Sequence, residues 1–145
     1  MKTFIDRIIE YLDDEFAKIS TLSKKPKGHY AYEKGLTPTA TTPYYVVQLL
    51  DNYTNKEDFQ EEVSVNMPIQ VNVYGVKMNI DNVDTSAQKV ATILGDMCVD
   101  ILEKFKYSQS DIIAMRRTSC TPALPYEDGS KAYFTAIRYN ITKQK

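Results

Sequence analysis

The sequence predicts an α+β fold: a mainly antiparallel four-stranded sheet with two helices packed on one face, in the order α-β-β-α-β-β. Residues 63–74 alternate apolar and polar side chains over a stretch longer than an ordinary strand of about 5–6 residues. Residues 2–20 and 84–105 carry apolar stripes with helical spacing. At 145 residues, the chain is expected to form a single domain.

The first helix is expected over residues 2–20. Phe4, Ile8, Leu12 and Phe16 recur at every fourth position, and Thr3 is suited to cap the N-terminus. The opposite side is charged. This pattern predicts a helix that packs on the sheet through its apolar stripe.

Residues 21–43 are expected to form a flexible arm or long loop, because three of the six prolines and two of the five glycines fall there. Tyr30 and Tyr32 lie among several lysines, beside the single histidine, His29. Basic residues interleaved with aromatic ones can bind single-stranded nucleic acid. The same composition also fits a solvated arm, or one that docks on a neighbouring subunit.

The first strand is expected over residues 44–51, where a nearly continuous apolar run predicts partial cover on both faces. A polar connection over residues 51–60 leads to the long strand 63–74, which is expected to pair back as a hairpin. The even positions of the long strand form an uncharged polar face. Pro68 lacks a ladder donor, so it is expected at an edge position or a bulge. The polar residues of this strand are Ser64, Asn66, Gln70 and Asn72, with Tyr74 near its end.

After a connection over residues 75–82, the second helix is expected over residues 84–105, capped by Asp84. Cys98 lies on its apolar stripe and is interpreted as a small core residue. A third strand over residues 111–119 directs Arg116 and Arg117 to opposite faces. A proline-rich loop then leads to the last strand, residues 131–142, in which Arg138 lies opposite the Tyr133–Ile141 face.

The near-neutral net charge of the chain argues against two classes of function. Eighteen basic residues balance nineteen acidic ones, whereas nucleic-acid-binding and polybasic membrane-surface proteins carry a basic excess. No apolar run approaches the roughly 18 residues of a membrane span. The two cysteines show neither metal-site nor disulfide spacing, which indicates a reducing compartment.

No catalytic constellation appears in the sequence. A Cys–His or Ser–His site would have to recruit His29 from the arm. Adjacent carboxylates such as Asp13 and Asp14 diverge on a helix, and phosphate-loop, dinucleotide-binding and metal-ligand motifs are missing. We therefore expect no enzyme activity, no cofactor and no metal site.

The uncharged face of the long strand is the most informative surface. Charge normally protects exposed strands from pairing with other chains, and the middle of this strand carries none. We expect the sheet to be completed or covered by neighbouring copies. The alternative is a monomer whose sheet face is hydrated.

Two strand tracts and a helix between them carry a family resemblance. The first tract is VSVNMPIQVNVYG, which contains Gln70–Tyr74 and precedes the helix VDTSAQKVATILGDMCVDILEKF. The second is YFTAIRY, residues 133–139, in the last strand. In these tracts and in element order, residues 1–20 and 44–142 resemble the tail terminator or tail-completion (head–tail joining) proteins of long-tailed bacteriophages. The arm at 21–43 departs from that pattern.

The resemblance implies a non-catalytic virion protein, made in the bacterial host cytoplasm and built into the tail or neck. It implies a homohexameric ring that contacts the tail tube protein and a neck or head-completion protein, with DNA only passing through the lumen and no membrane involved. A second hypothesis, of another class, is a small nucleic-acid- or peptide-binding α+β module that uses the arm. The candidate subunit contacts are Ser64, Asn66, Gln70, Asn72, Tyr74, Arg116, Arg117, Arg138, Tyr30 and Tyr32.

Overall fold

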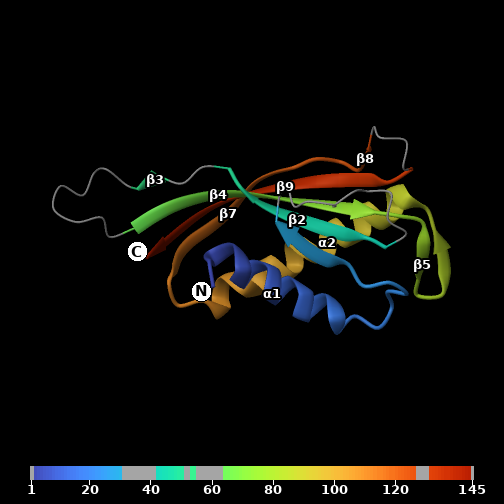
Figure 1. Ribbon diagram of the computed structural model, residues 1–145, viewed down its shortest axis with the longest axis horizontal. Coiled ribbons are helices and arrows are strands. Elements are labelled where there is room, and N and C mark those ends of the chain that lie inside the picture. Colours follow the sequence, from blue (N-terminus) through green and yellow to red (C-terminus); the bar gives the residue numbers. More distant parts are fainter. Residues whose placement is uncertain (1, 31–41, 51–52, 55–63, 127–130, 145) are drawn as a thin grey trace.

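The computed structural model describes residues 2–30, 42–50, 53–54, 64–126 and 131–144. It shows one large sheet with two helices, α1 (Phe4–Ala17) and α2 (Ala87–Ser108), on the same side of it (Figure 1). The α+β class, the mainly antiparallel pairing and the two helices on one face are as predicted.

The sheet has more strands than the four predicted. Its main path is β1-β2-β4-β9-β7, formed by β1 (Lys27–Tyr30), β2 (Tyr44–Leu49), β4 (Ser64–Gly75), β9 (Tyr133–Gln144) and β7 (Ile112–Cys120). Two short strands, β3 (Tyr53–Thr54) and β8 (Leu124–Pro125), pair with β4 and β9. β1 runs parallel to β2, so the pairing is mixed. The added strands are too short for an alternating pattern to predict them.

Helix α1 begins with a capping box. Thr3 Oγ1 accepts a hydrogen bond from Asp6 N at 3.1 Å, and the Asp6 carboxylate accepts one from Thr3 N at 2.8 Å. These bonds satisfy backbone donors that a helix N-terminus leaves open. The predicted cap at Thr3 is confirmed, and the apolar stripe from Phe4 to Phe16 is buried.

Helix α2 starts later than predicted. Asp84 lies instead in the hairpin β5 (Met78–Ile80) and β6 (Val83–Thr85), which projects from the end of the sheet where α2 begins (Figure 1). Ser86 is the cap, because its hydroxyl accepts a bond from Lys89 N at 3.3 Å. The stripe of α2 covers β4, β9 and β7, and Cys98 is fully buried in the core, as predicted.

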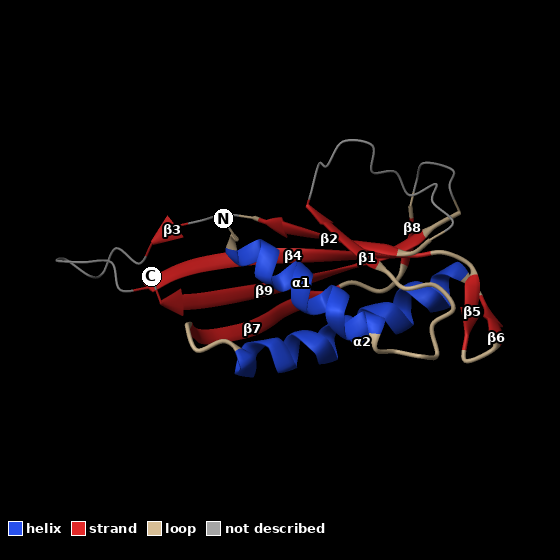
Figure 2. Ribbon diagram, turned by 60° about the horizontal axis from the view of Figure 1, so that its bottom comes forward, coloured by secondary structure: helices blue, strands red, loops and turns tan. Residues whose placement is uncertain are grey.

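The long strand β4 lies at the centre of the sheet, between β2 and β9 (Figure 2). Met67, Ile69, Val71 and Val73 are buried beneath the helices, which confirms the predicted alternation. The predicted hairpin with the preceding strand is also confirmed, because β2 and β4 pair antiparallel. The residues from Tyr44 to Val47 are all buried.

Pro68 lies in this central strand, so the prediction of an edge or bulge position is wrong. Its carbonyl accepts a bond from Leu50 N at 2.8 Å, one residue beyond the last β2 pair, Leu49 with Ile69. A strand residue directs its N and O to the same side. The nitrogen of Pro68, which has no hydrogen to donate, therefore faces the end of β2. No hydrogen bond between the paired residues of β2 and β4 is lost.

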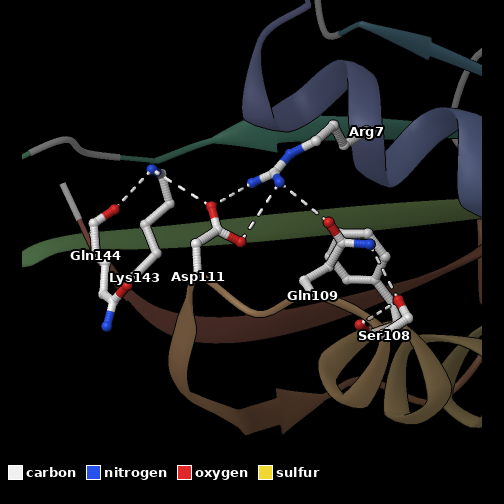
Figure 3. Close-up of polar contacts among 7 residues, drawn as sticks. Arg7, Ser108, Gln109, Asp111, Lys143 and Gln144 are labelled. Atoms are coloured by element: carbon white, nitrogen blue, oxygen red, sulfur yellow. Dashed lines mark hydrogen bonds and ion pairs between the residues drawn. The ribbon is translucent and has the colours of Figure 1, made fainter.

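A polar cluster ties α1 to the end of α2 and to the last strand (Figure 3). Arg7 donates to Asp111 Oδ2 at 2.7 Å and to Gln109 Oε1 at 3.0 Å, while Lys143 Nζ lies 3.9 Å from Asp111 Oδ2. The hydrogen bond and charge of Arg7 hold the pKa of Asp111 below its ordinary value. This cluster joins the two ends of the chain.

Candidate contact surface

The side of the sheet away from α1 and α2, here called the outer face, carries the even positions of β4. Register places Gln70 opposite Arg138, Asn72 opposite Ala136 and Tyr74 opposite Phe134 on β9. The outer face thus brings together side chains that are 60 to 68 residues apart in the sequence. It consists of a polar region, an aromatic region and the edge strand β7.

Hydrogen bonds between side chains organise the polar region. Arg138 Nε donates to Gln70 Oε1 at 2.8 Å, and Gln70 Nε2 donates to Asn72 Oδ1 at 2.8 Å. Thr142 donates to Asn66 Oδ1 at 2.9 Å. Three of the predicted contact residues, Arg138, Gln70 and Asn72, therefore form one bonded set, and Asn66 is held separately by Thr142. Side chains that are oriented before a partner binds lower the entropic cost of binding.

Ser64 does not belong to the accessible part of this surface. Its side chain is only 7% exposed in the single chain. The alternating pattern of the sequence predicted that Ser64 lies on the polar face. Such a pattern does not predict whether other residues bury the end of the strand. Ser64 is therefore a poor contact residue as the chain stands.

The aromatic region is a row of rings that crosses β2, β4 and β9. Tyr44 stacks on Tyr74 with centroids 4.6 Å apart, and Tyr74 stacks on Phe134 at 5.8 Å. Tyr126 meets both Tyr74 and Phe134 edge-on. Of these four rings, only Tyr74 was predicted from the sequence as a contact residue. The others could have been found by pairing Tyr74 with the aromatic residues at matching positions of the neighbouring strands.

The edge strand β7 carries Arg116 and Arg117. Arg116 pairs with Asn140, an outer-face residue, and Arg117 with Tyr139, a residue of the helix side, so the two side chains point to opposite faces as predicted. All residues from Arg116 to Cys120 are exposed. Within the described part of the chain, no strand pairs with the other side of β7. The register shifts twice along it, before Ala114 and before Ser119.

The arm residues lie elsewhere. Tyr30 belongs to β1, at the edge of the sheet opposite β7. Its hydroxyl donates to the Asp6 carboxylate and lies 2.9 Å from Thr3 Oγ1, so it fixes β1 to the start of α1. The prediction of a flexible arm is wrong for Lys27–Tyr30, because these tertiary bonds order it. Tyr32 lies outside the described residues.

The thiols and the imidazole lie apart from one another. His29 on β1 packs edge-on against Tyr44, whereas Cys120 lies on β7 at the other edge. Burial raises the pKa of Cys98 to about 12, so this thiol is not a nucleophile near neutral pH. Among the described residues, no group of His, Cys, Asp and Glu side chains could hold a metal ion.

Comparison with known protein families and with curated proteins gave no match for this chain. In the part of the chain that the structure describes, no helix is long and apolar enough to cross a membrane. The outer face and β7 are therefore the features of the chain that bear on its function.

Proposed function

We propose that this chain is a structural, non-catalytic virion protein that forms a ring at the end of a phage tail tube and joins the tail to the head or neck. The observation that carries the proposal is the pairing of the two resembling tracts. Gln70–Tyr74 and Tyr133–Tyr139 lie on adjacent strands in register, and Gln70 bonds to Arg138. The outer-facing residues of the two tracts therefore lie on one surface, as a shared subunit contact would require.

The physical character of that surface suits repeated protein contacts. It offers amides and one arginine that are already oriented by hydrogen bonds, and it lies next to an exposed strand edge. Such edges are normally covered or paired in a finished assembly. A ring closes when one surface of each copy meets a different surface of the next. The proposed partners are other copies in a hexamer, the tail tube protein and a neck protein, with DNA passing through the lumen.

The alternative, a nucleic-acid- or peptide-binding module that uses the arm, has less support. Tyr30 is bonded to α1, and the rings of Tyr44, Tyr74 and Phe134 use their faces on one another. Base stacking needs a ring face that is open. The rings of Tyr44, Tyr74 and Phe134 therefore offer little to single-stranded nucleic acid.

Light scattering after size exclusion tests the proposal, with the protein alone at several concentrations and mixed with purified tail tubes. We expect a ring-sized oligomer in solution or on the tubes. Arg138→Glu should prevent it, because the change breaks the bond to Gln70 and reverses a surface charge. Lys77→Glu, on the projecting hairpin, is the matched control and should behave as the wild type. A chain that stays monomeric, does not bind the tubes and shifts the electrophoretic mobility of labelled single-stranded DNA would contradict the proposal.

A further inference from the structure

The described acidic residues lie outside the large sheet, whereas basic residues occur both on the sheet and on the helices. The strands of the large sheet contain no described acidic residue, while β7 and β9 carry Arg116, Arg117 and Arg138. The described acidic residues all lie on the helices, on the β5–β6 hairpin or in the turn after α2. They are Asp6, Glu10, Asp13, Asp14, Glu15, Asp81, Asp84, Asp96, Asp100, Glu103 and Asp111.

The acidic residues of α1 are mostly engaged within the chain. The Asp6 carboxylate bonds to Thr3 N, and Asp13 Oδ1 accepts from Gly28 N at 3.0 Å and from the Tyr45 hydroxyl at 2.6 Å. Two further acidic residues of this helix form ion pairs, Glu10 with Lys2 and Glu15 with Lys18, each at 2.8 Å. Among the acidic residues of α1, Asp14 is therefore the one that is exposed and has no described hydrogen bond or ion pair, while Asp6 and Asp13 are half-buried and keep their charge.

Helix α2 presents a different acidic row. Asp96, Asp100 and Glu103 follow at spacings of four and three residues, so they share one face of the helix, and all three are exposed. Glu103 lies 3.3 Å from Lys106. Within the described part of the chain, no ion pair engages Asp96 or Asp100. The exposed Lys104 lies one turn beyond Asp100, so the unpaired negative charge of α2 is at Asp96 and Asp100.

The edge of β7 carries the matching charge. Arg116 and Arg117 are exposed, and no described carboxylate forms an ion pair with either. The two register shifts of β7 disrupt an even ladder, which disfavours the addition of another strand. Proteins also protect such an edge by covering it with a helix.

We propose that the β7 edge of one copy docks against the α2 acidic row of a second copy, with Arg116 and Arg117 reaching Asp96 and Asp100 from the two faces of the sheet edge. The inference rests on the proposed ring and specifies its subunit contact. A sheet-layer surface meets a helix-layer surface, so the contact is between unlike surfaces, as a ring requires. Opposite charges at both surfaces steer the encounter and set the register.

A charge-swap experiment tests the contact. Self-association is measured by sedimentation velocity at low ionic strength for the wild type, for Arg116→Glu with Arg117→Glu, and for Asp96→Lys with Asp100→Lys. Each double variant should associate roughly tenfold more weakly than the wild type, since two close attractions become repulsions. An equimolar mixture of the two variants should associate again, because each swapped surface then meets its complement. Asp14→Lys on α1 and Lys77→Glu on the hairpin are the matched controls and should change nothing.

The outcomes separate the contact from the ring. Wild-type association that neither double variant weakens, or a mixture that fails to associate, overturns the contact but leaves the ring standing. A wild type that remains monomeric at all concentrations and binds single-stranded DNA through the same arginines overturns the contact and favours nucleic acid. Rescue in the mixture with only closed dimers supports the contact and contradicts the proposed ring.

Discussion

Replacing Gly75 with alanine tests how closely the central strand β4 approaches helix α2. A Cβ atom at this position would lie 2.3 Å from Ala91 N, 2.7 Å from Ala91 Cα and 2.8 Å from Ala87 O. All three atoms belong to the α2 backbone, so no rotamer change can relieve the overlap. Overpacking a core costs about 1–3 kcal/mol, and because the helix itself must move we expect Gly75→Ala to lower the free energy of unfolding by about 3 kcal/mol.

Gly95→Ala is the matched control for this prediction. Its Cβ would meet only the Thr135 side chain, with Cγ2 at 2.7 Å and Cβ at 3.8 Å. The gain of about 0.8–1 kcal/mol in helix propensity offsets part of this overlap. We therefore expect a change within about 1 kcal/mol, and a stabilising effect of Gly95→Ala in a Thr135→Ser background, which lacks the methyl group. Urea unfolding followed by circular dichroism measures all four variants. A Gly75→Ala chain that is as stable as the wild type, or less destabilised than Gly95→Ala, would contradict the close approach of β4 to the α2 backbone.

Three further predictions concern single interactions. Asp111→Asn should cost about 1 kcal/mol at neutral pH, since the Arg7 pair is half-buried. The folded-state pKa of Asp111 is lowered, so this contribution is present above the unfolded pKa and is lost as pH falls through the folded one. Thermal melts of both proteins should converge in acid, and a constant gap would contradict the assignment. In the native chain a thiol reagent should label Cys120 and spare Cys98 until denaturant is added, because Cys98 is buried; equal labelling rates would show an open core. Tyr45→Phe should cost about 1–2 kcal/mol by urea unfolding, because it removes the hydroxyl shared by Asp13 and Ile9; an unchanged midpoint would contradict those bonds.

The elements that could be predicted from the sequence are those whose own side chains reveal their environment. The alternation in β4 predicted a half-buried strand, and the stripe of α1 predicted the helix and its cap. The hairpin β5–β6 was not predicted, although its turn has a recognisable sequence. Asp81 and Asn82 both have positive φ, 52° and 63°, and these residue types favour the tight hairpin turns that need it.

The rest depends on tertiary contacts that no local pattern encodes. Lys27–Tyr30 has no alternation, and it becomes an edge strand because Gly28 and Tyr30 bond to α1. The pairing of β4 with β9 joins the predicted hairpin of β2 and β4 to the last strand, and only this pairing brings Gln70 to Arg138. The outer-face residues could therefore be proposed individually, while their association into one surface needed the structure.

The proposed function requires this chain to complete a phage tail and to join the tail to the head. Negative-stain electron microscopy of particles assembled without the chain, beside particles assembled with it, tests this requirement. The proposed function predicts overlong or unjoined tails in its absence and normal particles when the chain is restored. Tails of normal length joined to filled heads in its absence would contradict the proposed function.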